Sequence, residues 1–201
     1  MKLIGMMDSP YVRRIAVSLE LYGIEFESMP LSVFRSFDAF ARINPVVKAP
    51  TLLLDNGVQL MESTLILYYF ETLAGAEQKL FPAEPEALAH DLRLLGVVLA
   101  ACEKAVQHIY EHNLRPEEKQ HQPWVARVTQ QLLAACQEWE TLLAGRPAAQ
   151  RPDQVCVTSA VVWTFIQSMI PHVVLAGDFK HIAWLADFCE TLPAFKKYPL
   201  C

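Results

Sequence analysis

The strongest constraint on the fold is a change of pattern near residue 80 of this 201-residue sequence. Before that point, short apolar runs typical of strands alternate with amphipathic segments typical of helices, whereas only helical patterns follow it. The first part is expected to be an α/β domain with the order β-α-β-α-β-β-α, a small mixed sheet with helices packed on it. The second part is expected to be an all-α helical bundle. We therefore predict domains at residues 1–79 and 86–201, joined by a linker at residues 80–85.

Turn and cap residues set the expected bounds of the elements. Gly23 ends the first helix, Asn56-Gly57 is typical of a tight hairpin turn, and Gly75 is expected to end the last helix of the first domain as a left-handed cap. Strands are expected at residues 2–5, 25–30, 51–54 and 58–61, and helices at 10–22, 36–43, 64–74, 86–114, 124–143, 155–170, 182–190 and 193–198.

Residues 155–177 contain no Asp, Glu, Lys or Arg and are long enough to span a bilayer. Polar side chains and the Pro171-His172 pair interrupt this segment, and a helix that is apolar on all sides also suits the centre of a globular bundle. We therefore expect a buried helix here and no membrane association.

The charge balance and the cysteines exclude several classes of protein. The formal net charge is −5 and no long run of Lys or Arg is present, so the electrostatic footprint of a nucleic-acid-binding protein is missing. The N-terminal MKLIGMMDSP has too short an apolar run for a signal peptide, which favours a cytoplasmic location. The five cysteines are odd in number and form no CxxC pair, which indicates reduced thiols.

Ser9 and Pro10 stand at the junction of the first expected strand and the first expected helix. Serine is a preferred N-cap residue and proline is favoured in the first helical turn, so the pair is typical of a helix start without further function. A helix start also presents free N–H groups and a partial positive charge, which can hold a thiolate or a carboxylate of a ligand. The two roles of Ser9 are compatible.

Pro50 stands immediately before the third expected strand, in the run NPVVKAPTLLLDNG. Proline is tolerated at the first residue of a strand, and the Ala49–Pro50 bond could be trans or cis. A trans bond would be an ordinary strand start. A cis bond would leave the backbone N–H and C=O of Ala49 facing outward, where they could pair with an extended peptide ligand.

Glu62 and Ser63 stand immediately before the last helix of the first domain, in the run LMESTLILYYF. Ser63 is expected to be the N-cap, and Glu62 is electrostatically favoured beside a helix start. A serine hydroxyl with backbone N–H groups can bind a ligand carboxylate, and a glutamate can bind an ammonium group. The pair therefore suits the head group of an amino acid, which presents both.

Together these motifs resemble those of the glutathione S-transferase superfamily. The resemblance is carried by SPYVRRIAVSLELYGIEFE, INPVVKAPTLLLDNG and LMESTLILYYFETL, and it covers nearly the whole chain. It implies a thioredoxin-like N-terminal domain followed by a helical C-terminal domain. The overall pattern is most similar to the bacterial members of the superfamily.

The resemblance implies that glutathione is a co-substrate and that Ser9 hydrogen-bonds its sulfur. Ala49, before a cis Pro50, would pair by its backbone with the cysteinyl part of glutathione. Glu62 and Ser63 would hold the γ-glutamyl head group. The implied glutathione site consists of Ser9, Lys48, Ala49, Pro50, Glu62 and Ser63, in which Lys48 contacts a carboxylate of glutathione.

The chemistry of these residue types fits that role. An unperturbed thiol has a pKa of about 8.5, so only a few per cent of it is thiolate at pH 7. Lowering this pKa by about two units takes about 2.7 kcal/mol. One charge-assisted hydrogen bond and a helix dipole together supply such an amount. The thiolate would then attack a small hydrophobic electrophile.

The sequence departs from the family pattern at several points. Tyr11 competes with Ser9 for contact with the sulfur, or lines the electrophile pocket. Val47 replaces a glycine that is usual before the lysine. The capping box usual at the start of the buried helix is missing, and the alignment places Cys156 and Ser159 there, with Asp153 slightly earlier. Other candidates to line the electrophile pocket are Tyr110, Trp163 and Phe165.

A possible metal motif lies in the run QHIYEHN, in which His108, Glu111 and His112 match H-x-x-E-H. Two histidines on one helical face can share a zinc ion, but a third ligand is needed and no downstream partner stands out. We therefore expect no metal.

The resemblance favours a detoxifying glutathione transferase that forms a homodimer through the helix at residues 64–74 and the first bundle helix. The alternative is a non-catalytic binding or regulatory protein with the same fold. Neither the electrophile nor the choice among conjugation, peroxidase, isomerase and dehalogenase chemistry follows from the sequence.

Overall fold

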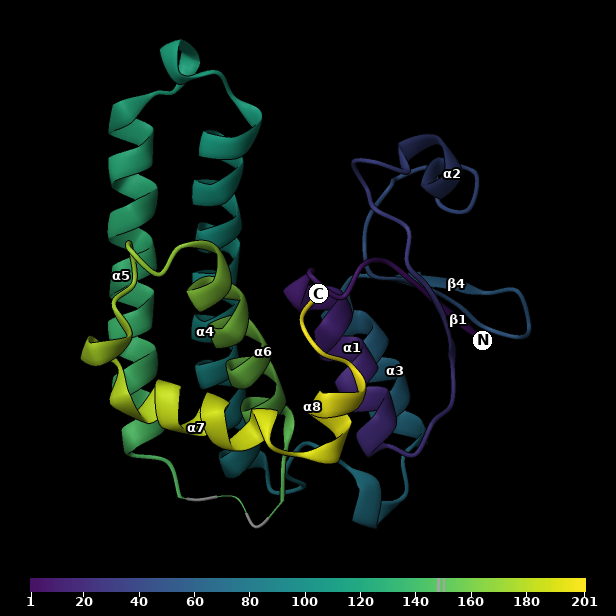
Figure 1. Ribbon diagram of the computed structural model, residues 1–201. Helices are drawn as coiled ribbons and strands as arrows, with labels where there is room; N and C mark the ends of the chain where they lie inside the picture. Colours follow the sequence, from purple (N-terminus) through teal and green to yellow (C-terminus); the bar gives the residue numbers. More distant parts are fainter. Residues whose placement is uncertain (148, 150) are drawn as a thin grey trace. The chain divides into compact units, whose positions relative to one another are not determined.

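The computed structural model describes residues 1–147, 149 and 151–201, and its elements confirm the expected fold class (Figure 1). The described residues divide into two compact units, Met1–Phe81 with Thr191–Cys201, and Pro82–Glu190. The first unit contains the sheet, and the second is helical. The last eleven residues thus belong to the first unit, although by sequence they lie in the range expected for the helical domain.

The sheet of the first unit has four strands of three residues each, in the order β2-β1-β3-β4. β1 is parallel to β2 and antiparallel to β3, and β3 is antiparallel to β4. This mixed pairing follows from the connections, because the first helix returns the chain for a parallel strand and the Asn56-Gly57 turn closes a hairpin. The strands are β1 (Lys2–Ile4), β2 (Glu27–Met29), β3 (Thr51–Leu53) and β4 (Gln59–Met61).

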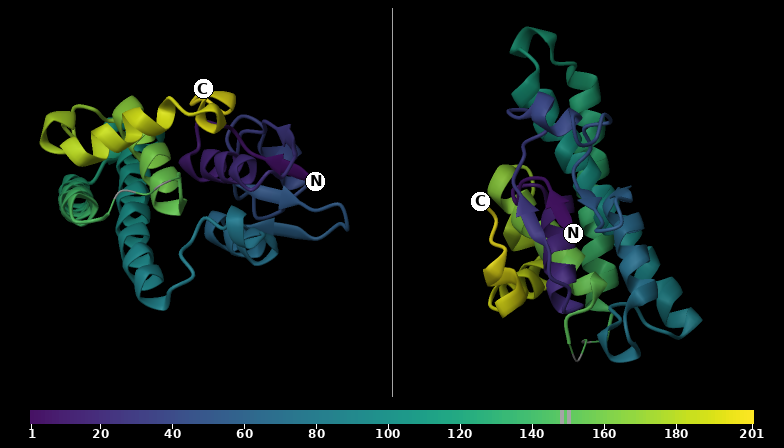
Figure 2. Two further views of the ribbon diagram at one scale, coloured as in Figure 1. Left: turned by 90° about the horizontal axis from the view of Figure 1, so that it is seen from below. Right: turned by 90° about the vertical axis from the view of Figure 1, so that its right-hand side faces the viewer.

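Two helices bury their apolar faces against this sheet. The interior that they share with the strands contains Leu3 of β1, Leu52 of β3, Ile15 and Leu19 of the first helix, and Ile66 of the later helix. The C-terminal helix, yellow in Figure 2, lies against the first helix. The helices of this unit are α1 (Pro10–Leu21), α2 (Phe37–Ala41), α3 (Ser63–Leu73), the short 3-10 helix η1 (Ala76–Gln78) and α8 (Pro193–Lys197).

Both ends of α3 differ from the prediction. The N-cap is Glu62 and not Ser63, because the Glu62 carboxylate accepts hydrogen bonds from the N–H groups of Thr64 at 3.1 Å and Leu65 at 3.3 Å. A carboxylate at this position also interacts favourably with the helix dipole. At the other end Gly75 has a φ of −62° and is not a left-handed cap, since α3 ends where Ala74 turns extended.

The second unit is built on two long helices that lie side by side, α4 and α5 (Figure 1). α6 is the buried helix expected from the uncharged segment, and it packs against α4 and α7. Among the described residues, no helix is long and apolar enough to cross a membrane. The elements are α4 (Pro85–Leu114), η2 (Glu117–Lys119), α5 (Gln122–Ala144), α6 (Gln154–Met169), η3 (Ala176–Asp178) and α7 (Lys180–Glu190).

A cluster of charged side chains fixes the start of α6. Asp153 is the N-cap and accepts a hydrogen bond from the Cys156 N–H at 2.9 Å. The cap is thus supplied by Asp153, which precedes the aligned positions Cys156 and Ser159. Arg146 donates to both oxygens of Asp91, at 2.8 and 2.7 Å, and to Asp153 at 2.8 Å. Burial alone would lower the pKa of the Arg146 guanidinium, but the two carboxylates raise this pKa above its ordinary value.

Candidate functional site

The sequence motifs of the first unit meet at one edge of the sheet because of the strand register. Ile4, at the end of β1, pairs with Thr51, at the start of β3, and Thr51 in turn pairs with Met61, at the end of β4. Segments that leave the sheet at these residues must therefore emerge side by side. The motifs that do so are Ser9-Pro10 after β1, Ala49-Pro50 before β3, and Glu62-Ser63 after β4.

Ser9 is the N-cap of α1, as predicted. Its backbone is extended and its Oγ accepts a long hydrogen bond, at 3.4 Å, from the N–H of Val12. A hydroxyl that accepts from the backbone keeps its own proton for donation to a ligand. Ser9 and the neighbouring Tyr11 are both half-buried. The cap and the donor role are therefore compatible in the structure.

Gly5 permits the close approach between the start of α1 and the segment before β3. Its φ is +141°, and a Cβ at this position would lie 2.5 Å from Val12 Cγ2 and 3.2 Å from Ala49 Cβ. Glycine can adopt this φ and, because it has no Cβ, it avoids these short contacts. The residue thus brings Ala49 close to the first turn of α1.

The Ala49–Pro50 bond is cis, which selects between the two forms that the sequence left open. Pro50 is buried, Ala49 is half-buried and packs against the core of the first unit, and Lys48 is exposed. The exposed lysine places a positive charge, on a flexible side chain, next to Ala49.

A buried polar network, which the sequence reasoning missed, holds this segment. Thr51 Oγ1 donates to the carbonyl oxygen of Lys48 at 2.6 Å and accepts from Asn44 Nδ2 at 2.8 Å. Asn44 Oδ1 accepts from the Val46 N–H at 3.0 Å. Asn44 and Thr51 are no more than 1% exposed, so these bonds are shielded from water. The available signal was Asn44 before Pro45, a pair typical of turn initiation.

Val47 has a φ of +51°, in the left-handed region that strongly disfavours a β-branched residue. We expect Val47→Gly to raise the free energy of unfolding by about 1 kcal/mol. Relief of about 1–2 kcal/mol of left-handed strain outweighs the added entropy of glycine in the unfolded chain, about 0.5–1 kcal/mol. Urea denaturation measures the difference. Val46→Gly is the matched control, since exposed Val46 has no such φ and its replacement should destabilise. A destabilised Val47→Gly would contradict the strain argument.

The start of α3 holds a buried charge that the sequence reasoning also missed. Ser63 is 1% exposed, and its Oγ lies 3.3 Å from Glu62 Oε1 and 3.3 Å from Arg14 Nη1. The same Nη1 donates to Thr64 Oγ1 at 3.2 Å, and Arg14 itself is 1% exposed. Glu62 adopts a φ of +71° to place its carboxylate over the helix start. In the sequence, the only signal for Arg14 was a charged residue within an apolar helix.

The candidates for the electrophile pocket do not share one environment. Trp163 and Phe165 lie in the interior of the second unit, 4% and 8% exposed. Trp163 packs edge-on against Trp139 and Phe179, with ring centroids 6.1 and 5.9 Å apart. Tyr110, in contrast, is 42% exposed on α4. Tyr11 belongs to the first unit and stands two residues beyond Ser9.

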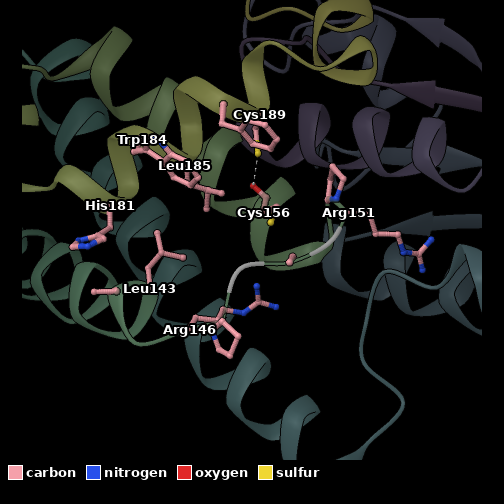
Figure 3. Close-up of a pocket in the computed structure, with 13 residues that line it drawn as sticks. Leu143, Arg146, Arg151, Cys156, His181, Trp184, Leu185 and Cys189 are labelled. Carbon is pink, nitrogen blue, oxygen red and sulfur yellow. Dashed lines mark hydrogen bonds between the residues drawn. The ribbon is translucent and has the colours of Figure 1, made fainter.

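The second unit also contains a pocket of about 250 Å³ that the sequence did not indicate (Figure 3). It is mainly apolar, and the stacked rings of Trp184 and Phe188 line it together with the thiols of Cys156 and Cys189. The contact with Cys156 and the burial of the thiol raise the pKa of Cys189, so this thiol stays protonated at neutral pH. None of the motif residues of the first unit lines this pocket.

The two histidines of the possible metal motif interact with each other. Their rings lie 4.4 Å apart, His112 Nδ1 is 2.7 Å from the carbonyl oxygen of His108, and His108 Nδ1 is 3.0 Å from Thr129 Oγ1. Burial and the charges of His112 and His172 lower the pKa of His108. Across the described chain no group of three or more ligating side chains is placed to hold a metal ion.

His108 makes stability depend on pH. Its pKa is lowered in the folded state, so the unfolded chain binds more protons once the pH falls through about 6.5, and stability then decreases. We expect His108→Gln to lose less stability than the wild type between pH 7.5 and 5.5 in urea denaturation. His90→Gln, which removes an exposed histidine of the same helix, serves as the control for the substitution itself. Equal pH dependences of His108→Gln and wild type would refute this prediction.

Comparisons with known proteins agree with the geometry of the first unit. The family model described as glutathione S-transferase, N-terminal domain, matches residues 3–78. The chain is 30% identical over 130 residues to the GST-like protein YibF of Escherichia coli, a match covering 59% of this chain and 64% of that protein. It is 32% identical over 84 residues to glutathione S-transferase U7 of Arabidopsis thaliana, covering 42% and 37%. The chain thus spans about one third to two thirds of the length of these relatives.

Solved structures extend the similarity to the whole chain. A glutathione S-transferase from Methylobacterium radiotolerans, in complex with glutathione sulfonate, has a TM-score of 0.90 and 26% identity over 98% of this chain and 93% of that chain. A glutathione transferase family member from Pseudomonas fluorescens, with bound glutathione, has a TM-score of 0.82 and 24% identity over 98% and 97%. The second comparison concerns the fold alone.

Proposed function

The chain belongs to the glutathione S-transferase superfamily, and we propose that it binds glutathione and stabilises its thiolate for attack on a small hydrophobic electrophile. One observation carries the proposal: the strand register brings the Ser9, Ala49-Pro50 and Glu62-Ser63 motifs to the same edge of the sheet. These motifs offer a donor for sulfur, a backbone edge for a peptide and a polar pocket for an amino-acid head group.

Each motif supplies a different type of contact. At the start of α1 the Ser9 hydroxyl and the helix dipole both favour a thiolate over a thiol, which lowers the thiol pKa. The cis peptide before β3 offers Ala49 for backbone pairing with the cysteinyl group. Ser63 receives the γ-glutamyl carboxylate, Glu62 its ammonium group, and Lys48 a carboxylate. The ligand needs no metal for this chemistry.

A homodimer in a reducing cytoplasm completes the proposal. Large apolar side chains are exposed on both helices of the expected interface: Leu65, Tyr68 and Leu73 of α3 are 61%, 70% and 61% exposed, and Leu92 of α4 is 50% exposed. Burial of such side chains by a second copy would remove them from water. All five cysteines are free thiols, which suits a reducing compartment.

Calorimetric titration with glutathione tests the binding step. We expect the wild type to bind, and Glu62→Gln to bind at least about tenfold more weakly, since a hydrogen bond to a charged group contributes about 1.5–3 kcal/mol. Glu25→Gln, an exposed glutamate of the same unit, is the control and should bind like the wild type. Absence of binding by the wild type would overturn the proposal.

A second measurement separates an enzyme from a binding protein. Incubation of the wild type with glutathione and an aromatic chloro-dinitro electrophile should yield the glutathione conjugate, detected by mass spectrometry above the uncatalysed rate. Binding of glutathione without acceleration of any electrophile in a panel of halides, peroxides and unsaturated carbonyls would favour a non-catalytic protein with this fold.

A further inference from the structure

Two thiols of the second unit lie next to each other although they are far apart in the sequence. Cys156 is in the first turn of α6 and Cys189 is in the last turn of α7, and these two helices pack together. The Cys189 Sγ lies 3.9 Å from the carbonyl oxygen of Cys156, a contact drawn as a dashed line in Figure 3. A hydrogen bond between the two thiols is the largest cause of the raised pKa of Cys189. The two side chains are therefore in direct contact.

The apolar pocket of the second unit gives small molecules access to this pair. Both cysteines line the pocket, together with the rings of Trp184 and Phe188. These two rings are 66% and 50% exposed, so the pocket reaches the surface of the unit. Its mainly apolar lining favours a small apolar molecule over a strongly hydrated one. Cys136 of the same unit is buried but does not line the pocket.

The two thiols differ in their readiness to react first. Cys156 is 7% exposed, whereas Cys189 is fully buried. Because its pKa is raised, Cys189 stays protonated at neutral pH, and a protonated thiol is a poor nucleophile. Cys156 is thus the thiol that meets a molecule in the pocket, and Cys189 is the neighbour that can react with the product.

We propose that Cys156 and Cys189 form a modification site at which a small apolar hydroperoxide converts the two thiols to a disulfide. The Cys156 sulfur attacks the terminal oxygen of the hydroperoxide. An S–O bond forms, the O–O bond breaks, and the thiol proton passes to the departing alkoxide, which leaves as an alcohol. Cys156 is then a sulfenic acid.

The second step uses the contact between the two side chains. The Cys189 sulfur attacks the Cys156 sulfur, an S–S bond forms, the S–O bond breaks, and the Cys189 proton leaves with the hydroxyl group as water. The two thiols lose two electrons in total, which reduce the hydroperoxide to alcohol and water. An S–S bond is only about 2.05 Å long, so rotation of the side chains must bring the sulfurs closer than they are in a thiol contact. The contact holds the reacting groups together and favours this step over reaction with a thiol from solution.

Oxidation of the folded protein with cumene hydroperoxide tests the inference. Cys201→Ser is the parent protein, because removal of the exposed Cys201 prevents disulfides between molecules from interfering. We expect the intact mass to fall by two hydrogen atoms, peptide mapping to find Cys156 linked to Cys189, and dithiothreitol to reverse the change. Cys136 is the internal control and should stay reduced. Circular dichroism verifies that the protein is folded during the reaction.

Single substitutions in the same parent test the order of the two steps. In Cys189→Ala the sulfenic acid of Cys156 has no thiol beside it, so dimedone should trap it. In Cys156→Ala the remaining Cys189 should stay a thiol. Trapping of Cys189 and not of Cys156 would overturn the assignment of Cys156 as the thiol that reacts first.

The inference is independent of the proposed function, because no residue of the proposed glutathione site takes part. Free thiols at both positions after treatment of the folded parent would overturn the inference. Equal oxidation of Cys136 and of the pair would also overturn it, since oxidation would then follow unfolding and not access through the pocket. Peptide mapping of the parent gives this answer even where an alanine variant does not fold. Failure of the wild type to bind glutathione would overturn only the proposed function.

Discussion

Replacement of Arg146 by methionine is expected to lower the free energy of unfolding by about 3–5 kcal/mol, since removal of one partner leaves buried charges without compensation. Arg146 binds both Asp91 and Asp153. The side chains of all three residues are less than one fifth exposed, at 17%, 11% and 18%. Without the guanidinium, two carboxylates that converge on one point would repel each other in a poorly solvated site.

The effect should also reach α6, because Asp153 is its N-cap. A carboxylate displaced by repulsion would lose its hydrogen bond to the Cys156 N–H, and loss of a cap costs about 1 kcal/mol. Urea denaturation of the wild type and Arg146→Met at pH 7 measures the total loss in the free energy of unfolding. Addition of Asp91→Asn to Arg146→Met should restore part of this free energy, because it removes one of the two negative charges.

Arg93 offers the matched control on α4. Its bond to Glu138 is 2.7 Å long, but the two side chains are 61% and 45% exposed. An exposed pair of this kind contributes about 0–1 kcal/mol, so Arg93→Met should have a small effect. Equal losses in Arg146→Met and Arg93→Met would show that burial does not decide the contribution of the cluster.

The order of the elements could be predicted from the sequence because it depends on local patterns. Apolar spacing sets each helix and strand, and Gly23 and Gly57 adopt the positive φ angles, 71° and 82°, that their turns require. The prediction was wrong where two neighbouring residues could both serve as the N-cap of one helix. Glu62 and Ser63 can both cap α3, and only the positive φ of Glu62, at 71°, lets its carboxylate reach the helix start.

Contacts between distant residues could not be predicted from the sequence. The backbone of Tyr198 accepts from Arg13, and its ring stacks on Phe26 at 5.3 Å, which ties the C-terminus to the first unit. No local pattern encodes a pairing across 185 positions. The same reason applies to Arg14, whose hydrogen bond to Ser63 joins residues 49 positions apart. Asn44 and Thr51 are closer in sequence, but their hydrogen bond joins two polar side chains, which the spacing of apolar residues does not predict.

Replacement of Ser9 by alanine is expected to raise the pKa of bound glutathione by one to two units and to reduce kcat/KM by about 10- to 100-fold at pH 7. This magnitude corresponds to the loss of one hydrogen bond to a charged group, about 1.5–3 kcal/mol. The thiolate is the nucleophile, so a higher pKa reduces its fraction at neutral pH. Ultraviolet titration of the protein in the presence of glutathione measures the pKa of the bound thiol, and conjugation kinetics measure kcat/KM.

The cap role of Ser9 must be separated from its role toward sulfur. Ser9→Ala removes both the hydroxyl and a good cap, and the lost cap alone costs about 1 kcal/mol of stability. Ser9→Gly removes the hydroxyl while it costs only a few tenths of a kcal/mol as a cap. The two variants should therefore differ in the free energy of unfolding and agree in the pKa of the bound thiol.

Tyr11→Phe tests whether Tyr11, in place of Ser9, donates the hydrogen bond to the sulfur. The substitution keeps the ring and removes only the hydroxyl, so it should leave the pKa of the bound thiol within a few tenths of a unit of the wild type if Ser9 is the donor. A large rise in Tyr11→Phe together with an unchanged pKa in Ser9→Gly would transfer the sulfur contact to Tyr11. Ser9 would then remain only the N-cap of α1, and the dipole of α1 would stabilise the thiolate without the Ser9 side chain.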